Sequence, residues 1–447
     1  MASELPTLRQ QQISEVQRLV AGGNCVAIHG LSNTGKSPFL RALAAPDNQK
    51  RFGDIAGRPA AMIYVDCNRV VELSATGFYE VIIRSLLEFI EDPHTPPEPS
   101  AELLSQLREY HNRITTGPAF QASLAFNNAL ADTCNRLNLT LGLLFDEFDE
   151  IYATLEDRTL LNLRALKDHT RDRLVYVTAT VRRLVDSRGR GDNEFVELFN
   201  DTFSLGLLDE PDAAAVILSQ GGDALTNPTV ETILRLAGGH FGLLGALTQA
   251  ALRFPHGGPD SRRLTSDAGA RAECLKVWNQ LRPDEQAGLA ALVGAPEESP
   301  APPDLDRLRA LGLVVDGPAG PAIFSDLFAG FVRRQSALPS ANAQGVVVDD
   351  DAGEVWVDGA RVTVLTDLEY KLMRLLHQRR DRLTTKDLIV ETVWGGEYLD
   401  RVDDARIEKL VSRLRAKIEP EPASPRYLLT QRGRGYKLSS IPVVEEG

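Results

Sequence analysis

The stretch GLSNTGKS, residues 30–37, decides the fold of the first part of this chain. It follows a short apolar stretch at 24–30 and leads into a helical pattern at 38–44. Glycines in such a loop let backbone N–H groups face phosphate oxygens, and the start of the following helix adds the positive end of its dipole. The spacing therefore predicts a phosphate-binding loop (P-loop), with Lys36 at the β- and γ-phosphates and Ser37 on Mg²⁺.

The loop and the first helical turn supply the predicted nucleotide contacts. Pro38 falls in that turn, where its missing N–H costs little. ATP and Mg²⁺ are the cofactors that this pattern predicts. The predicted cofactor-binding residues are Gly30, Ser32, Asn33, Thr34, Gly35, Lys36, Ser37 and Pro38.

A second motif supports the first. The stretch LTLGLLFDEFDE, residues 139–150, is an apolar strand with an acidic end. Asp146 is predicted to hold Mg²⁺ through water, and Glu147 to polarise the attacking water. The alternative is a solvated acidic loop that follows a core strand. Because a P-loop precedes it, we favour a nucleotide site with slow ATP hydrolysis that serves as a switch.

A further strand, RLVYVTAT at 173–180, ends in a threonine and is followed by two arginines. Thr180 is predicted to sense the γ-phosphate and Arg182 to neutralise it. The alternative is that the arginines extend along the surface. In the loop 186–194, Arg188 or Arg190 is a candidate to act in trans on a second molecule, and the alternative is an exposed loop without such a role.

Apolar strands alternate with helical patterns up to about residue 208, which indicates a parallel sheet with helices on both faces. Helices then follow, and the last one precedes a hairpin pattern, LVVDGPAGPAIF at 313–324, in the outline of a winged helix. From residue 345 the pattern changes again, to four short strands, three helices and a final hairpin at 427–438. We therefore predict an α/β P-loop NTPase with a helical lid, followed by two winged-helix domains. The predicted boundaries are 1–208 for the ATPase core, 209–260 for the lid, 261–335 for the first winged helix, 336–345 for a linker and 346–440 for the second winged helix.

Composition narrows the class of protein. The chain has 447 residues and a net charge of −13, so any nucleic-acid contact needs a local basic patch. Its four cysteines form no CxxC pair, which argues against a zinc site or a disulfide scaffold. The N-terminus has no apolar signal core, and no stretch approaches the ~20 apolar residues of a membrane helix. We expect a cytoplasmic protein without a membrane partner.

Such a patch lies near the end of the chain. In the stretch 403–419, apolar residues follow one helical face beside a basic stripe, and the hairpin TQRGRGYKL at 430–438 follows. From Arg401 to Lys437 there are ten Lys or Arg against five Asp or Glu. This predicts contact with double-stranded DNA, whereas the alternative is a solvated basic helix. The predicted DNA-binding residues are Arg406, Lys409, Arg413, Arg415, Lys417, Thr430, Arg432 and Arg434.

The first ~335 residues resemble the STAND/AAA+ class of ATPases, near the bacterial and archaeal relatives of origin-recognition ATPases. The matching stretches are GLSNTGKS, FDEFDE, VTATVRR, LAGGHFGLLGAL and GLVVDGPAGPAIFSDLFAGFVRRQ. The resemblance implies that a lid turn touches the nucleotide, here through His240, although Phe241 stands where proline is usual. The alternative for His240 is a helix-capping turn. The resemblance also implies a docking or inhibitory role for the first winged helix, where Phe324, Leu327, Phe328 and Phe331 are expected in the core.

Residues 346–440 resemble the OmpR/PhoB-type winged helix of bacterial response regulators, on the stretches LTDLEYKLMRLL, LIVETVW, SRLRAKIE and YLLTQRGRGYKL. The resemblance implies DNA contacts from Arg413 and Arg415 of a recognition helix and from Thr430 and Arg432 of the wing. It also implies head-to-tail pairs on direct repeats, and RNA polymerase contact by the loop 395–401. In that family a receiver domain normally precedes the DNA reader, and here the ATPase module stands in its place.

The sequence therefore predicts an ATP-switched, nucleoid-associated bacterial regulator of transcription that forms homo-oligomers when ATP binds. Three alternatives remain open at this point. They are a signal-sensing STAND ATPase, for example in phage defence, an origin-recognition-like initiator or loader, and a nucleotide-binding scaffold that has lost turnover.

Overall fold

The computed structural model describes residues 8–92, 100–187, 194–254, 261–294, 304–317, 320–337, 345–349, 354–358, 360–362, 365–395 and 404–440. The chain divides into two compact units, Met1–Gly330 and Phe331–Gly447. Among the described residues, no helix has both the length and the apolar character needed to span a membrane.

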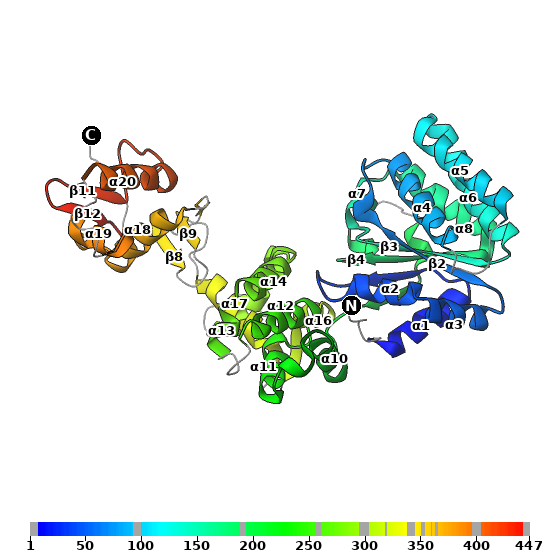
Figure 1. The fold of residues 1–447 in the computed structure, drawn as a ribbon, viewed down its shortest axis with the longest axis horizontal. Coiled ribbons are helices and arrows are strands. Elements are labelled where there is room, and N and C mark those ends of the chain that lie inside the picture. Colours follow the sequence, from blue (N-terminus) through cyan, green and yellow to red (C-terminus); the bar gives the residue numbers. More distant parts are fainter. Residues whose placement is uncertain are drawn as a thin grey trace. The chain divides into compact units, whose positions relative to one another are not determined.

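The first unit is built on a sheet of five parallel strands in the order β2-β3-β4-β1-β5 (Figure 1). Four of them coincide with apolar strands that the sequence predicts, at 24–30, 60–67, 139–150 and 173–180. The fifth, β5, was not predicted, because its side chains alternate between half-buried and exposed and form no apolar run. The strands are β1 (Val26–His29), β2 (Ala60–Asp66), β3 (Thr140–Asp146), β4 (Leu174–Thr180) and β5 (Asp201–Ser204).

Helices cover both faces of this sheet, as predicted (Figure 1). Alternate strand residues face opposite layers, so Ile28 and Val177 pack in one core while Ala27 and Tyr176 pack in the other. The layer with Ile28 contains α1 (Gln10–Ala21), α2 (Lys36–Ala44) and α3 (Pro46–Ala56). The opposite layer contains α4 (Ala75–Ile90), α5 (Ala101–Thr116), α6 (Ala119–Arg136) and α8 (Asp157–Thr170).

Two helices of these layers were not predicted. The buried positions of α6 include Ala122, Ala125 and Ala129, which give only a weak apolar stripe. Helix α3 buries Phe52 alone. Both helices therefore lack the strong apolar period from which helices are predicted, and packing against their neighbours stabilises them.

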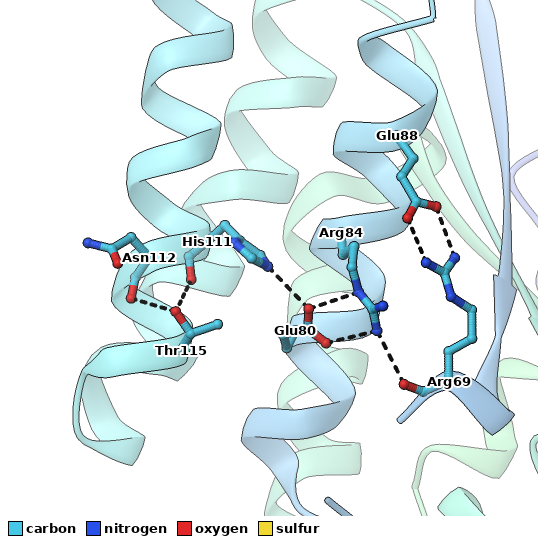
Figure 2. A network of polar contacts seen from close by, with 7 residues as sticks. All are labelled: Arg69, Glu80, Arg84, Glu88, His111, Asn112 and Thr115. Atoms are coloured by element: carbon cyan, nitrogen blue, oxygen red, sulfur yellow. Dashed lines mark hydrogen bonds and ion pairs between the residues drawn. The ribbon is translucent and has the colours of Figure 1, made fainter. Parts of the chain in front are cut away.

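A polar network anchors the chain where it leaves β2 (Figure 2). Glu80 of α4 accepts hydrogen bonds from Arg84 and from His111 of α5. Arg69, at the end of the short 3₁₀ helix Cys67–Arg69, pairs with Glu88, and its carbonyl accepts from Arg84. Each partly exposed pair stabilises the fold only modestly. Together they fix the path of the chain directly after Asp66, beside the acidic end of β3.

The rest of the first unit is helical and ends in the predicted hairpin. Its elements are α10 (Glu210–Gly221), α11 (Asn227–Ala237), α12 (Phe241–Leu252), α13 (Ser261–Thr265), α14 (Ala268–Asn279), α15 (Pro283–Val293), α16 (Leu305–Ala310), β6 (Val314–Gly317) and β7 (Gly320–Ile323). Phe324, Leu327, Phe328 and Phe331 are buried, as expected. All but the first lie in a helix, α17 (Asp326–Ala337), which was not predicted. This helix extends into the segment that was predicted to be a linker.

The described residues of the second unit form three of the four predicted short strands, followed by the three predicted helices and the hairpin. The described strands β8 (Val346–Asp349), β9 (Glu354–Val357) and β10 (Ala360–Arg361) form an antiparallel sheet. The helices are α18 (Asp367–Gln378), α19 (Lys386–Val393) and α20 (Asp404–Ile418), and the hairpin is β11 (Leu428–Gln431) with β12 (Gly435–Leu438). Tyr436 is buried at the return of the hairpin.

Candidate functional site

The topology of the sheet brings the predicted phosphate-binding and acidic residues to one edge. All five strands are parallel, so their carboxyl ends meet at the same edge of the sheet. Strand β4 lies between β1 and β3, and its last residue, Thr180, is level with His29 of β1. The P-loop, Thr180 and Asp146 therefore come together although they are far apart in the sequence.

The P-loop has the backbone shape that its glycines permit. Gly35 has φ +96°, and a Cβ at Gly30 would lie 2.5 Å from the carbonyl oxygen of Leu205. Neither position accepts a larger residue without strain. The N–H groups in the first turn of α2, which begins at Lys36, lack acceptors within the helix. The glycines leave room for phosphate oxygens to come close to the backbone N–H groups of the loop. The residues present therefore fit a bound nucleotide.

Lys36 is 4% exposed, and its Nζ donates to the carbonyl oxygens of Gly30 at 2.8 Å and Leu31 at 3.0 Å. Burial lowers the pKa of Lys36, while the carboxylates of Glu147, Asp149 and Asp146 oppose this shift. The ammonium group is therefore held over its own loop, with the acidic residues close enough to act on it.

The acidic end of β3 is organised rather than solvated. Asp146 is 2% exposed, and its Oδ1 accepts a hydrogen bond from the N–H of Glu147 at 3.1 Å. Glu147 has φ +50°, a conformation that costs energy for a residue with a Cβ and that is concentrated at functional sites. Burial raises the pKa of Glu147, as do Asp146 and Asp149, against the influence of Lys36. These features argue against the alternative of a solvated acidic loop.

Two residues near Asp146 were not recognised from the sequence. Tyr64 of β2 donates its hydroxyl proton to Oδ2 of Asp146 at 2.5 Å. The carboxylate of Asp149, at the start of α7 (Asp149–Thr154), accepts from the N–H of Val181 at 2.9 and 3.1 Å. Burial raises the pKa of Asp149. Among the described residues, no His, Cys, Asp and Glu side chains form a group of three or more that could hold a metal by themselves.

Thr180 and Arg182 make contacts other than those predicted. The hydroxyl of Thr180 donates to the carbonyl oxygen of Arg182 at 2.6 Å. The guanidinium of Arg182 donates to the carboxylate of Glu285 at 2.9 and 2.7 Å and to the carbonyl oxygen of Gln280 at 2.8 Å. We call this set of three residues the Arg182 latch. It contradicts the alternative in which Arg182 merely extends along the surface, because its side chain is 18% exposed.

Glu285, in α15, has a side chain that is 1% exposed. Burial opposes its ionisation, but hydrogen bonds from Arg182 and from the N–H of Arg282, with the nearby charge of Arg307, lower its pKa below the ordinary value. Arg307 approaches the same carboxylate at 3.0 Å. Glu285 is therefore ionised at neutral pH and forms a buried ion pair.

The helical region also contacts the P-loop directly. The N–H of Ser32 donates to Oε1 of Gln280 at 2.8 Å, and the side-chain amide of Asn33 donates to Glu273 at 2.5 Å. His240 is buried, and its Nδ1 accepts from the N–H of Leu243 at 3.3 Å. Nε2 therefore carries the proton and donates to the carbonyl oxygen of Ser32 at 3.2 Å. His240 thus caps α12, as the alternative predicts, and also contacts the P-loop; its contact with the nucleotide stays a prediction.

The protonation of His240 leads to a prediction. Burial lowers the pKa of His240 to about 4, and Lys36 acts in the same direction against Glu273 and the carbonyl of Ser32. The unfolded chain, with an ordinary histidine pKa near 6.5, binds this proton more tightly than the folded chain. The free energy of unfolding is therefore not reduced by His240 above that pH. As the pH falls toward 4, protonation of His240 in the unfolded chain lowers it by about 3 kcal/mol at most. The thermal midpoint should fall more steeply between pH 7 and pH 5 in the parent protein than in His240→Gln. Equal slopes in both proteins would contradict this assignment.

A cavity of about 450 Å³ lies beside the P-loop. Its lining includes Arg9, Pro38, Leu208 and Phe241, and its size is typical of small-molecule sites. The ring of Phe241 lies 3.5 Å from where a Cβ of Gly35 would be. Phe241 thus places an aromatic ring at the junction between the P-loop and the cavity.

Arg9 also lines this cavity and was not recognised from the sequence. Its guanidinium donates to the carbonyl oxygens of Thr34 at 3.1 Å and Gly206 at 2.6 Å. Burial lowers the pKa of Arg9 to about 10. Arg9 therefore ties the P-loop to the segment that connects β5 with α10.

The predicted DNA-binding surface lies in the second unit. The apolar residues of α20 (Ile407, Leu410, Val411, Leu414 and Ile418) are buried, as the amphipathic pattern predicts. Arg406, Lys409 and Arg413 are exposed on the same helix. At the hairpin, Thr430, Arg432 and Arg434 are exposed, and Gly433 has φ +68° in the turn. The exposed arginines thus come from one helix and from the tip of the hairpin that follows it.

Arg415, Lys417 and Thr430, which are predicted to bind DNA, make contacts within the domain. Arg415 donates from Nε and Nη2 to the carbonyl oxygen of Leu428 at 3.0 and 2.6 Å, and from Nη2 to the hydroxyl of Thr430 at 2.8 Å. Lys417 donates to Glu369 at 2.7 Å, and the side chain of Glu369 is only 3% exposed. Arg415 therefore braces α20 against the hairpin, and Lys417 neutralises a buried carboxylate. Arg188, Arg190 and most of the loop 395–401 lie outside the described residues.

Comparison with known proteins concerns the two units separately. Residues 360–438 match the family model described as transcriptional regulatory protein, C terminal. The DNA-binding response regulator MtrA of Mycolicibacterium paratuberculosis is 38% identical over 108 residues, which cover 24% of this chain and 47% of MtrA. YrkP of Bacillus subtilis, called an uncharacterized transcriptional regulatory protein, is 34% identical over 93 residues, 21% of this chain and 39% of its own. The chain thus spans less than half the length of these curated relatives.

Solved structures resemble the chain more distantly. The Walker-type ATPase PABY2304 of Pyrococcus abyssi has a TM-score of 0.47 and 16% identity, over 74% of this chain and 100% of its own. The ORC2 protein of Aeropyrum pernix, in complexes with ADPNP and ADP, has a TM-score of 0.48 and 13% identity, over 75% and 97%. The DNA-binding domain of CpxR from E. coli has a TM-score of 0.19 and 27% identity, over 23% and 97%.

Proposed function

Because the chain joins a P-loop ATPase module to an OmpR/PhoB-type winged-helix domain of transcriptional regulators, we propose that it is a DNA-binding regulator of transcription whose nucleotide state controls DNA binding. The observation that carries the proposal is the set of hydrogen bonds between the helical region and the nucleotide site. Gln280 and Glu273 contact the P-loop, while Glu285 holds Arg182. A ligand that alters these contacts would shift the helical region between two positions.

The charges at the Arg182 latch favour ADP when the latch is closed and ATP when it is open. The γ-phosphate of ATP needs cationic partners, and Arg182 at the end of β4 is one of them only if it leaves Glu285. ADP has no γ-phosphate that could compete with Glu285 for Arg182. In our proposal, nucleotide-free and ADP-bound protein keep the latch closed, and ATP opens it. The same helical region also contacts the P-loop at Ser32 and Asn33, so ATP bound in the loop would act on these contacts as well as on the latch.

The remaining predicted residues have roles in this scheme. Ser37 in the first turn of α2 and Asp146 at the end of β3 would hold Mg²⁺, which neutralises phosphate charge when it is bound with the nucleotide. Glu147 would orient water for a slow hydrolysis that returns the protein to the ADP state. The cavity lined by Arg9 and Phe241 would take the base and ribose, with an aromatic ring against one face.

The second unit would bind DNA in response to the nucleotide state. Arg406, Lys409 and Arg413 on α20 would lie along a major groove, and Arg432 and Arg434 would reach phosphates or the minor groove. Assembly of ATP-bound chains would place two such domains on a repeated site and raise affinity through effective concentration. Contact with RNA polymerase and action at the bacterial nucleoid belong to the same proposal. The regulator names of the matched relatives support this function for the domain.

The test is binding of the full chain to genomic DNA fragments with Mg²⁺ and ATP, with Mg²⁺ and ADP, or without nucleotide, over a salt series. We expect site-selective binding with ATP and a loss of at least tenfold with ADP. Equal affinity in the three states would remove the switch. Unselective binding together with an ATPase stimulated by a nucleic-acid or protein trigger would favour a trigger-sensing ATPase, whereas ATP-dependent recruitment of a helicase would favour an initiator or loader.

The DNA-binding face gives a prediction in which two neighbouring arginines behave differently. Arg413→Ala should weaken specific DNA binding by about 1–3 kcal/mol if this side chain reads a base, with an unchanged thermal midpoint. Arg415→Ala should lower the thermal midpoint of the domain, because it removes three hydrogen bonds to Leu428 and Thr430. Fluorescence anisotropy with a labelled duplex and thermal unfolding separate the two effects. A stability loss in Arg413→Ala, or none in Arg415→Ala, would contradict these assignments.

A further inference from the structure

We infer that Tyr64 is a positioning residue that holds Asp146 in the orientation for a nucleotide-bound Mg²⁺ ion, and that Arg41 connects Tyr64 to the nucleoside cavity. The inference rests on the proposed nucleotide binding and goes beyond it, because it assigns a role to two residues outside the P-loop and outside the acidic motif.

The strand register places the phenol on the correct side of the sheet. Tyr64 of β2 is level with Leu144 of β3, and Asp146 follows Leu144 by two residues. Side chains two apart in a strand point to the same face, and diagonal neighbours on adjacent strands are within reach of an aromatic side chain. Tyr64 and Leu144 pack in the core that α1, α2 and α3 cover. The hydroxyl of Tyr64 therefore reaches Asp146 on the face where the P-loop helix lies.

Both oxygens of Asp146 have a hydrogen-bond donor in this arrangement. Oδ2 accepts from the hydroxyl of Tyr64 at 2.5 Å, and Oδ1 accepts from the N–H of Glu147 at 3.1 Å. Two donors from different directions fix the plane of the carboxylate. A carboxylate that acts on Mg²⁺ through water depends on this orientation, and loss of such a supporting partner typically costs about 10–100-fold in metal affinity.

Arg41 extends the arrangement to the cavity. It follows Ser37 by four residues on α2, so the two side chains share a helix face. Its Nη2 donates to the hydroxyl oxygen of Tyr64 at 3.2 Å, and its Cζ lies 4.9 Å from the centre of the Tyr64 ring. The same residue lines the 450 Å³ cavity. A continuous set of contacts thus runs from the cavity through Arg41 and Tyr64 to Asp146.

The competing explanation is that Tyr64 only packs its ring in the core. Tyr64→Phe separates this explanation from the positioning role, because it keeps the ring and removes the hydroxyl. The full chain would be titrated with Mg²⁺ in the presence of a fluorescent ADP analogue, and the affinity for the analogue would also be measured in EDTA. We expect the Mg²⁺ concentration at half-saturation to rise about tenfold in Tyr64→Phe. The affinity in EDTA should stay close to that of the parent protein, and the thermal midpoint should fall modestly because Oδ2 of the buried Asp146 loses a donor.

Two further variants complete the test. Tyr79→Phe is the matched control, because the hydroxyl of Tyr79 accepts from Asn162 in the core on the opposite face of the sheet, and it should leave both affinities unchanged. Arg41→Gln, on an exposed helical position, should raise the half-saturating Mg²⁺ concentration about two- to threefold. It tests the same set of contacts if Tyr64→Phe folds poorly.

The outcomes distinguish this inference from the proposed function. An unchanged Mg²⁺ dependence in Tyr64→Phe, with normal nucleotide binding by the parent protein, overturns the role of Tyr64 and leaves the proposed function intact. An equal loss of affinity with Mg²⁺ and in EDTA also overturns it, because Tyr64 then acts on the nucleotide or on the fold. If the parent protein binds no nucleotide under any condition, the proposed function fails and the inference fails with it.

Discussion

Lys36→Ala is expected to lower the affinity for ADP and ATP by at least ~100-fold. The ammonium group is buried at the start of α2 and is held over the loop by the carbonyl oxygens of Gly30 and Leu31. Bound phosphates would replace or join these acceptors, and charge-assisted hydrogen bonds of this kind contribute about 1.5–3 kcal/mol each. The loss of two of them, with nothing to replace the charge, corresponds to about 3 kcal/mol or more.

The measurement is equilibrium binding of a fluorescent ADP analogue to the parent and variant proteins. Lys50→Ala is the matched control, since Lys50 is an exposed lysine of α3 in the same layer. Lys36 lowers the pKa of Glu147 and Asp149, so its removal also takes a stabilising charge away from these carboxylates. Thermal unfolding is therefore followed as well. If Lys36→Ala binds nucleotide as the parent does, the loop is a structural element of a scaffold and the switch has no input.

The second large effect is expected from Glu285→Ala, which opens the Arg182 latch. This change removes a buried carboxylate that accepts two hydrogen bonds from Arg182 and lies 3.0 Å from Arg307. Removal of one partner of a buried ion pair typically costs about 3–5 kcal/mol, because the other charge is left without compensation. We expect most of this cost to fall on the closed arrangement. The open arrangement would be populated without ATP, so DNA binding would no longer require it.

Two measurements separate this effect from general damage. The ratio of the dissociation constants for ADP and ATP should shift about tenfold toward ATP in Glu285→Ala, and the DNA affinity with ADP should approach the affinity with ATP. Asp284→Ala is the matched control, since Asp284 is the adjacent carboxylate, is largely exposed and pairs with Arg307 at 3.0 Å. Identical behaviour of the two variants would show that the latch does not report on the nucleotide. If the two variants differ as expected, a double-mutant cycle of Glu285→Ala with Arg182→Ala measures how much of the coupling runs through this pair.

Local patterns predicted much of this molecule correctly, and particular elements show why. Strand β3 has a continuous apolar run and helix α20 has a strong apolar period, so their type and position could be predicted from the residues alone. The P-loop could be predicted because its glycines and lysine act through local backbone geometry. Helices α3 and α6 and strand β5 lack such periods, and contacts with neighbouring elements decide their structure.

The sequence by itself determined the two kinds of domain, the phosphate loop, the acidic strand end and the basic helix, because each depends on residues that are close together in the chain. Only the tertiary structure decided which charges are free to act. Arg413 and Arg415 are equivalent in the sequence pattern, but contacts with the hairpin turn Arg415 into a brace and leave Arg413 exposed. Arg182 meets Glu285 and Tyr64 meets Asp146 across 103 and 82 positions of the chain. Partners at that separation leave no periodic trace in a sequence, because the sheet and the packing of the helical region alone bring them within hydrogen-bond distance.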